Sequence, residues 1–124
     1  LTESLKWLKS LEIKNIRAHE EKLYRATSDI MSLNDDILLY PMNEYDGNTL
    51  CFNVKGITPA QLGAELNKRD ICVRSGYHCA PLAHSTLETD AGGAVRVSFG
   101  MYNTKKEIYI LCDEINKIAK GLKK

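Results

Sequence analysis

An Asp-Gly pair between two strand-like stretches is the feature that most restricts how this chain can fold. The first stretch reads ILLYPMNEY, the second reads NTLCFNV, and Asp46 and Gly47 separate them. Because glycine readily adopts the positive φ of a tight turn, this arrangement predicts a β-hairpin. Pro41 has no amide hydrogen to donate, so the first strand should lie at an edge or end early. Alternation gives the second strand two faces, with Leu50, Phe52 and Val54 on one and Cys51 and Asn53 on the other.

Apolar residues at helical spacing precede this hairpin. The stretch SLKWLKSLEI predicts a short amphipathic helix, and NIRAHEEKLYRATSDIM predicts a longer one. His19 falls on the apolar stripe of the longer helix. We therefore interpret His19 as a packing or interface residue and not as a catalytic one.

Two further helices have clear starts. Thr58 is a predicted N-cap, followed by Pro59 in the first helical position and by Gln61, which completes a capping box; this helix should run to about Arg69. Thr104 and Glu107 form the same pattern before the last helix. Its buried stripe should consist of Ile108, Leu111, Cys112, Ile115 and Ile118.

Two more strands are predicted between these helices, at ICVRS and AVRVSF. The resulting order is helix, helix, strand, strand, helix, strand, loop, strand, helix. This order indicates the α+β class, with a small, mostly antiparallel sheet and helices packed on one face.

Strand alternation places two arginines on the face away from the helices. If Ile71 and Val73 point to the helices, Cys72 and Arg74 point away, and Arg96 points away by the same argument on the next strand. Arginine is the preferred side chain for holding a carboxylate or phosphate through two parallel hydrogen bonds. The alternative is a pair of solvated surface arginines.

The loop between these two strands begins with VRSGYHCAPLAH, residues 73–84. Cys79 lies there with Arg74, His78 and His84 nearby in sequence, and positive charge lowers the pKa of a thiol, so Cys79 is a candidate reactive thiol. Gly76 allows a turn that a side chain would block. Three other interpretations stay open: a structural loop cysteine, a metal site formed by Cys72, His78, Cys79 and His84, and a Cys-His protease pair.

Composition narrows the function classes. The chain has 124 residues with a net charge of +1, 44% hydrophobic and 27% charged residues, as expected for one globular domain and not for a partner of nucleic acid or of a membrane. No apolar stretch is long enough to predict a transmembrane helix. The four cysteines include no CxxC pair, which favours reduced thiols and a cytoplasmic protein over a disulfide framework or a zinc ribbon. Because the chain starts at Leu1, we expect it to be a fragment of a longer protein.

The loop resembles the active-cysteine loop of the pyridoxal-phosphate-dependent cysteine desulfurases, in the class V aminotransferase family. Its pattern R-[ST]-G-x-H-C is similar to the Suf-type, or group II, branch. AVRVSFGMYNTKKEI resembles the next block of that family, R-x-S-x-x-x-[YF]-N-T, and NIRAHEEKL resembles the helix that leads into the C-terminal domain. The resemblance covers nearly the whole chain and implies the C-terminal small domain of a fold-type I enzyme.

The resemblance also implies roles for individual residues. Cys79 would be the nucleophile that takes sulfur from L-cysteine as a persulfide and releases alanine. Arg96 would bind the substrate carboxylate, and Arg74 would line the same pocket. His78 would transfer a proton or tune the thiol. No metal is implied.

The family forms a Schiff base between its cofactor and a lysine that follows a histidine, and this chain has no His-Lys pair. We therefore expect the lysine to lie outside the chain, in a large cofactor-binding domain, and the isolated chain to be inactive. Residues 1–32 would be helices that link from that domain, and residues 33–124 the small domain. The family implies a homodimer and a sulfur-acceptor protein that serves iron-sulfur cluster assembly or other sulfur biosynthesis.

Other functions stay open. Selenocysteine lyases, sulfinate lyases and ordinary class V aminotransferases share this scaffold, although a plain aminotransferase has no use for a loop nucleophile. From a different class, a non-catalytic α+β module could bind a ligand through Arg74 and Arg96, with Cys79 incidental.

Overall fold

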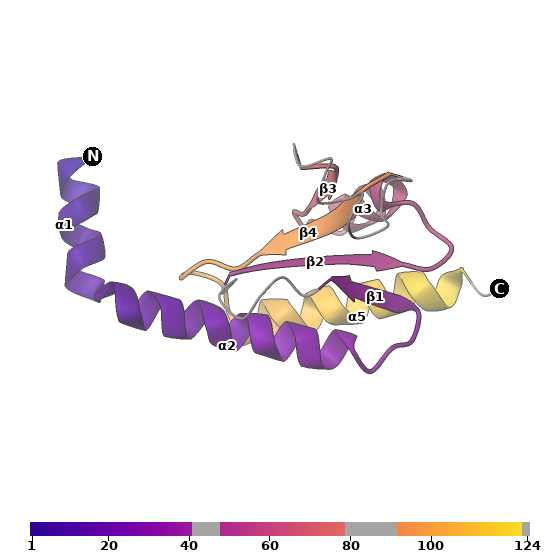
Figure 1. The fold of residues 1–124 in the computed structure, drawn as a ribbon, viewed down its shortest axis with the longest axis horizontal. Helices are drawn as coiled ribbons and strands as arrows, with labels where there is room; N and C mark the ends of the chain where they lie inside the picture. Colours follow the sequence, from indigo (N-terminus) through magenta and orange to yellow (C-terminus); the bar gives the residue numbers. More distant parts are fainter. Residues whose placement is uncertain (41–47, 79–91, 123–124) are drawn as a thin grey trace.

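The structure is a computed structural model that describes residues 1–40, 48–78 and 92–122. Its elements are α1 (Thr2–Leu11), α2 (Ile13–Met31), β1 (Ile37–Tyr40), β2 (Thr49–Val54), α3 (Pro59–Asn67), β3 (Arg74–Gly76), β4 (Ala94–Ser98) and α5 (Lys105–Gly121). This order of helices and strands is the one predicted from the sequence (Figure 1). The α+β class with a small antiparallel sheet is confirmed.

The sheet has the order β1-β2-β4-β3, and every neighbouring pair is antiparallel. The predicted hairpin is confirmed by the pairing of β1 with β2, in which Ile37 lies opposite Val54. The turn itself falls in residues 41–47, outside the described residues. β1 is an edge strand, which is one of the two placements that Pro41 predicted.

β3 begins later than predicted. Asp70 has a left-handed backbone with φ 57°, and the amide of Ile71 donates to Leu66 O at 3.1 Å, so these residues complete the end of α3. Pairing with β4 starts only where Arg74 meets Arg96. Ile71 and Val73 nevertheless pack against the core, so their predicted side is confirmed and only the predicted start of the strand is wrong.

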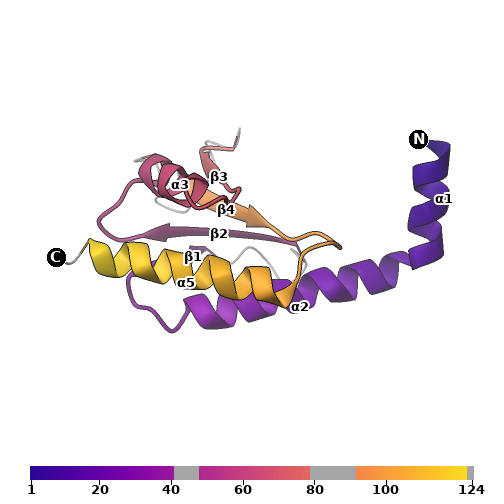
Figure 2. The ribbon, with the colours of Figure 1, turned by 180° about the vertical axis from the view of Figure 1, so that it is seen from behind.

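The helices begin where the capping pattern predicts. Thr58 with Gln61 and Thr104 with Glu107 each form both hydrogen bonds of a capping box, while α3 ends at Asn67, slightly before the predicted end. Figure 2 shows α3 and α5 in front of the strands, on one face of the sheet. The predicted stripe of α5 is buried there against the inward residues of β2 and β4, which include Leu50, Phe52, Val54, Val95 and Val97. The hydrophobic core therefore lies on the helix side of the sheet, and the opposite face of the sheet is not part of it.

α2 joins this core along α5. Leu23, Thr27 and Met31 are buried, and the Nε2 atom of His19 lies 2.9 Å from the carbonyl oxygen of Asn103. His19 thus links α2 to the turn before α5, as its position on the stripe predicted. The division of the chain at residue 32 stays a prediction.

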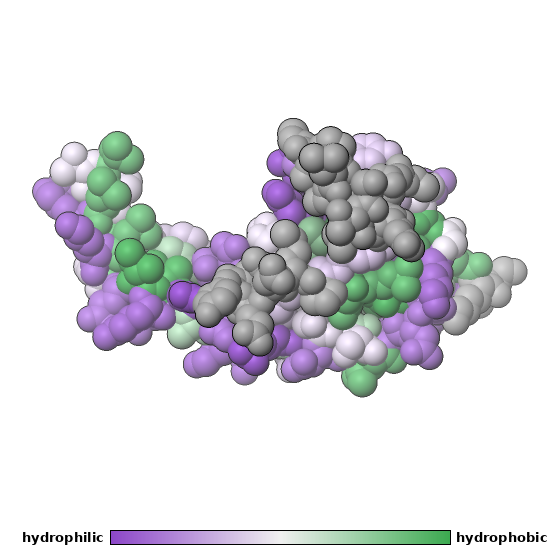
Figure 3. Space-filling view, viewed as in Figure 1, coloured by the Kyte–Doolittle hydropathy of each residue, from purple (hydrophilic) through white to green (hydrophobic). Residues whose placement is uncertain are grey.

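α1 departs from α2 at Glu12, whose φ of 59° interrupts the helix (Figure 1). No residue of α1 is buried. Its side chains Leu5, Trp7 and Leu8 are exposed. Figure 3 shows hydrophobic residues along the side of α1 that faces the viewer. Within the described part of the chain, no helix is both long and apolar enough to cross a membrane.

Candidate functional site

One cross-strand row on the face away from the helices carries both predicted arginines. Directly opposed residues of neighbouring strands share a face of the sheet. From one edge of the sheet to the other, the row consists of Tyr40, Cys51, Arg96 and Arg74. We call this side of the sheet the open face. Val95 and Val97, the chain neighbours of Arg96, are buried on the helix side, which confirms that Arg96 lies on the open face.

The packing of α3 fixes the direction of Arg74. A Cβ atom placed on Gly63 of α3 would lie only 2.9 Å from Ser75 Oγ, so Ser75 faces the helix. Successive strand residues point to opposite sides, and Arg74 therefore faces away from α3, as predicted. Arg74 is exposed, whereas Arg96 is half-buried.

Neither arginine has a charge partner among the described residues. All ion pairs found there involve other side chains, which lie on or beside the helices. The Nε atom of Arg96 is buried and has no hydrogen-bond partner in the described part of the chain. Like charges directly opposite each other on a sheet are destabilising. The pair is therefore suited to bind an anion, which would relieve the repulsion and satisfy the guanidinium hydrogens.

Two glycines shape the base of the loop that carries Cys79. Gly76 is the last residue of β3 and not a turn residue, and its φ of 116° lies in the region that an L side chain rarely adopts. Gly93 has φ 78°, and a Cβ atom there would overlap the backbone of Gly76 and Tyr77. The two ends of the loop therefore meet backbone against backbone.

Side chains hold the same two ends together. The amide of Gly92 donates to the hydroxyl of Tyr77 at 3.2 Å, and His78 Nε2 lies 3.0 Å from the carbonyl oxygen of Ala94. His78 itself has a left-handed backbone with φ 52°, which is costly for a residue other than glycine. The structure thus brings His78 to the strand that carries Arg96.

Cys79, the predicted nucleophile, follows His78 directly but lies outside the described residues, as does His84. The reactivity of Cys79 and the predicted influence of its neighbours stay predictions. In residues 1–40, 48–78 and 92–122, no three side chains of His, Cys, Asp or Glu gather as metal ligands would.

Sequence reasoning gave no role to Asn53, although it placed this residue on the open face. Its Nδ2 atom donates to the carbonyl oxygen of Gly93 at 3.0 Å and to the hydroxyl of Tyr40 at 3.4 Å. Asn53 thereby ties β2 to the end of the loop. The available signal was a polar amide in an otherwise apolar strand, but its partner Gly93 is 40 residues away in the chain.

The described cysteines differ in environment. Burial raises the pKa of the Cys51 thiol, against the opposing effect of the Arg96 charge. Burial also raises the pKa of Cys112 to about 11, whereas Cys72 is exposed. Cys51 therefore stays a neutral thiol near neutral pH and cannot compensate the charge of Arg96.

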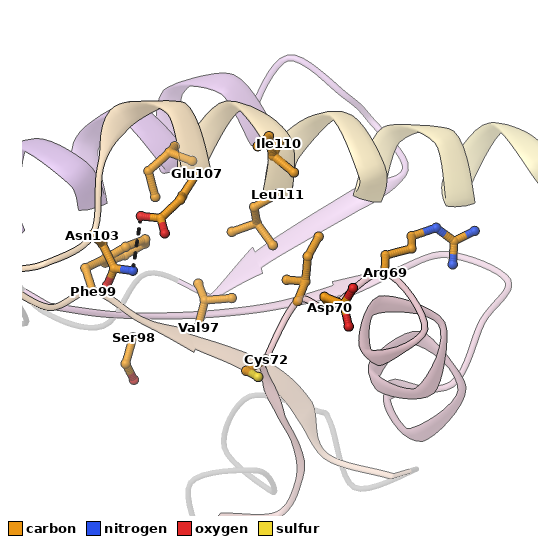
Figure 4. Close-up of a pocket in the computed structure, with 12 residues that line it drawn as sticks. Arg69, Asp70, Cys72, Val97, Ser98, Phe99, Asn103, Glu107, Ile110 and Leu111 are labelled. Atoms are coloured by element: carbon orange, nitrogen blue, oxygen red, sulfur yellow. Dashed lines mark hydrogen bonds between the residues drawn. The ribbon is translucent and has the colours of Figure 1, made fainter.

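A separate hollow of about 420 Å³ lies between α5, the end of β4 and residues 69–72 (Figure 4). Its wall is mostly apolar, with Val97, Phe99 and Leu111 among the lining residues. Two of its charged side chains already have partners: Arg69 pairs with Glu65 and Glu114, and Glu107 caps α5. We therefore place the candidate site at the open face and not in this hollow.

Comparison with known proteins identifies the family of this chain. A family model described as aminotransferase class-V matches residues 1–111. The chain belongs to this family. A probable cysteine desulfurase from Halobacterium salinarum is 34% identical over 118 residues, which are 94% of this chain and 28% of that protein. The family predicted from the loop motif is therefore confirmed. Members of this family, cysteine desulfurases included, depend on pyridoxal phosphate.

Solved structures give the same result at the level of the fold. The apo cysteine desulfurase from Thermococcus onnurineus superposes with a TM-score of 0.85 and 27% identity, over 94% of this chain and 29% of that chain. The cysteine desulfurase CsdA from Escherichia coli has a TM-score of 0.83 at 23% identity, over 91% of this chain and 27% of that chain, and so shares the fold. This chain spans only 17% to 30% of the length of the curated relatives it matches.

Proposed function

We propose that this chain is the C-terminal part of a Suf-type cysteine desulfurase, which converts L-cysteine to L-alanine and keeps the sulfur as a persulfide on Cys79. The names of the relatives support the activity class. Because the chain spans less than a third of those relatives, the activity belongs to the full-length protein.

One observation carries the proposal. Arg96 and Arg74 lie in register on the open face, without a carboxylate partner in the described residues, on the two strands that the Cys79 loop connects. An amino acid substrate brings the carboxylate that these guanidinium groups lack. The bonds of Tyr77 and His78 at the loop base support a loop that starts from a fixed point beside Arg96.

The proposed roles follow from these positions. Arg96 binds the carboxylate of L-cysteine, and Arg74 adds positive charge to the same pocket. The Cys79 thiolate attacks the substrate sulfur, so that a sulfur–sulfur bond forms and the carbon–sulfur bond breaks. The electron pair of the broken bond stays with the carbon, which takes up a proton and leaves as alanine. His78, with its ring against Ala94 O, tunes the Cys79 thiol or moves its proton.

The residues present fit the substrate side of a pyridoxal phosphate site. The described strand residues of the open face include Arg74 and Arg96 but no lysine, and the chain has no His-Lys pair, so we place the lysine that holds the cofactor outside this chain. Bound pyridoxal phosphate supplies an electron sink for the carbon–sulfur cleavage. The isolated chain would then be inactive.

The persulfide on Cys79 must pass its sulfur to an acceptor before the next turnover. We propose that the persulfide passes to an acceptor protein for iron-sulfur cluster assembly or other sulfur biosynthesis, that the full-length enzyme is a homodimer, and that it works in the cytoplasm. A reducing compartment would keep Cys79 as a thiol between turnovers.

The test uses the full-length protein with pyridoxal phosphate, L-cysteine and an excess of a thiol reductant, which reduces the Cys79 persulfide and releases its outer sulfur as sulfide, and it quantifies alanine and sulfide. We expect equal amounts of both from the native protein and neither from Cys79→Ala. Cys72→Ala is the matched control, because it removes an exposed thiol of the same chain and should retain full turnover. Activity that survives in Cys79→Ala would refute the proposal, and a strong preference for selenocysteine over cysteine would assign the protein to the lyases.

A further inference from the structure

Hydrogen bonds fix the orientation of the side-chain amide of Asn53. A backbone carbonyl only accepts hydrogen bonds, so the contact of 3.0 Å with Gly93 O requires the nitrogen of the amide at that end. The hydroxyl of Tyr40 lies on the same side of the amide, 3.4 Å from Nδ2. The oxygen of Asn53 must therefore point elsewhere.

The side-chain oxygen of Asn53 is a hydrogen-bond acceptor without a partner, and Arg96 has a donor without a partner, both among the described residues. Asn53 Oδ1 is buried without a partner among the described residues, and the same holds for the Nε–H donor of Arg96. A buried polar group that lacks a hydrogen bond is costly and calls for an explanation. Here one atom is an acceptor and the other a donor.

The register puts the two side chains within reach of each other. Arg96 lies directly opposite Cys51, and Asn53 is the next residue of β2 on the same face. Such diagonal neighbours across an antiparallel pair can be bridged by a long side chain. Cys51 itself is a poor substitute acceptor for Arg96, because its raised pKa keeps the thiol protonated and sulfur accepts hydrogen bonds weakly.

We infer that Asn53 is a positioning residue for Arg96: when a carboxylate ligand binds, Asn53 Oδ1 accepts the Nε–H of Arg96. With Nε engaged, the two terminal nitrogens of the guanidinium remain for the carboxylate, which fixes an end-on, bidentate geometry. The inference rests on the proposed function to the extent that Arg96 binds the substrate carboxylate. It goes further, because the same amide that orients the arginine also holds the end of the loop at Gly93.

A double-mutant cycle in the full-length protein tests this coupling. The binding of L-alanine, a carboxylate ligand that needs no sulfur chemistry, is measured by calorimetric titration for the native protein, Asn53→Ala, Arg96→Ala and the double variant. We expect Asn53→Ala to weaken binding about tenfold in the native background and to have almost no effect when Arg96 is absent, since the interaction is then already lost. In turnover, Asn53→Ala should raise KM for L-cysteine more than it lowers kcat.

Two further variants keep the test decisive. Asn34→Ala is the matched control: Asn34 is another half-buried asparagine, bonded to Asn116 at 2.6 Å away from the open face, and its loss should leave L-alanine binding unchanged. Asn53→Asp preserves the shape of the side chain, but its carboxylate would pair with Arg96, so binding should weaken at least as much as in Asn53→Ala.

Additive effects in the cycle, native-like binding by both Asn53 variants, or no L-alanine binding by the native protein would each overturn the inference. If the native protein binds L-alanine but releases none from L-cysteine, the proposed function fails, while the cycle still decides the role of Asn53.

Discussion

Arg96 is the residue on which the chemistry of the open face depends most. It is half-buried, faces Arg74 across the ladder and has no carboxylate partner among the described residues. A hydrogen bond to a charged group contributes roughly 1.5–3 kcal/mol, and about 1.4 kcal/mol corresponds to a factor of ten in binding. We therefore expect Arg96→Ala in the full-length protein to raise KM for L-cysteine by roughly 10- to 100-fold.

Arg96→Lys separates charge from geometry. Lysine keeps the positive charge but loses the planar fork that holds a carboxylate by two bonds, so its KM should lie between those of the native protein and Arg96→Ala. Steady-state kinetics measure all three. A lysine variant with native KM would mean that charge alone is needed there.

The thiols of the chain should differ in reactivity in a defined order. Raised pKa values leave little thiolate on the buried Cys51 and Cys112 near neutral pH, and burial also blocks access, while Cys72 is exposed. Brief treatment with iodoacetamide at pH 7 should therefore label Cys72 long before Cys51 or Cys112, as read by peptide mass spectrometry. If Cys79 is the activated nucleophile, it should be labelled before Cys72. Equal rates for all four thiols would contradict both the burial and the proposed activation.

At the scale of elements, the start of α5 is set by a short local motif. The hydroxyl of Thr104 accepts from the amide of Glu107, and Glu107 Oε2 accepts from the amide of Thr104 at 2.7 Å. Loss of an N-cap side chain costs about 1 kcal/mol. Thr104→Ala should lower the free energy of unfolding in urea by about that amount, whereas Thr104→Ser, which keeps the hydroxyl, should cost much less.

The same cap predicts a dependence on pH. The hydrogen bonds from Thr104 and Asn103 lower the pKa of Glu107 in the folded chain. Its contribution is therefore present above the unfolded pKa of about 4.3 and is lost as the pH falls through the lower folded value. Glu107→Gln should remove this part of the acid destabilisation. Identical acid unfolding profiles for the native and Glu107→Gln chains would show that the ionised carboxylate of Glu107 does not stabilise the start of α5.

The loop base offers a prediction with an internal control. Gly93 and Gly56 both have positive φ, of 78° and 83°, but only at Gly93 would a Cβ atom overlap backbone, that of Gly76 and Tyr77. Alanine at a left-handed position costs about 1–2 kcal/mol through φ alone. Gly56→Ala should show only that cost in urea unfolding, and Gly93→Ala distinctly more. Equal losses would mean that the loop ends are not in contact.

Elements with local signals were predictable from the sequence. The hairpin, both capping boxes and the stripe of α5 each depend on residues within one or two turns of chain, and all are confirmed. The start of β3 was predicted wrongly, because the left-handed turn at Asp70 and the choice of partner on β4 are set by packing. Alternation placed both arginines correctly. It could not reveal the bond from Asn53 to Gly93, because that contact joins residues 40 positions apart.

At the scale of the whole molecule, core and candidate site lie on opposite faces of one sheet. Leu50, Phe52 and Val54 of β2 are buried under the helices, while Cys51 and Asn53 of the same strand share the open face with the arginines. Each strand of the site is therefore fixed by a hydrophobic core that contains none of the proposed substrate-binding groups. This separation lets the open face keep uncompensated charge, because the core supplies the stability.

The same separation predicts what the chain does alone. With Arg74 and Arg96 but no lysine on the described strands of the open face, we expect the isolated 124-residue chain to bind a carboxylate there but not to hold pyridoxal phosphate covalently at that site. Purified chain mixed with the cofactor, L-cysteine and a thiol reductant should release sulfide no faster than the same mixture does without the chain. The absorption spectrum of the cofactor should likewise not change when the chain is added. The full-length protein, assayed in parallel, should exceed the buffer rate by orders of magnitude and lose that excess in Cys79→Ala. Catalytic sulfide release by the isolated chain would show that a group within these 124 residues replaces the lysine, and would move the cofactor site onto this domain.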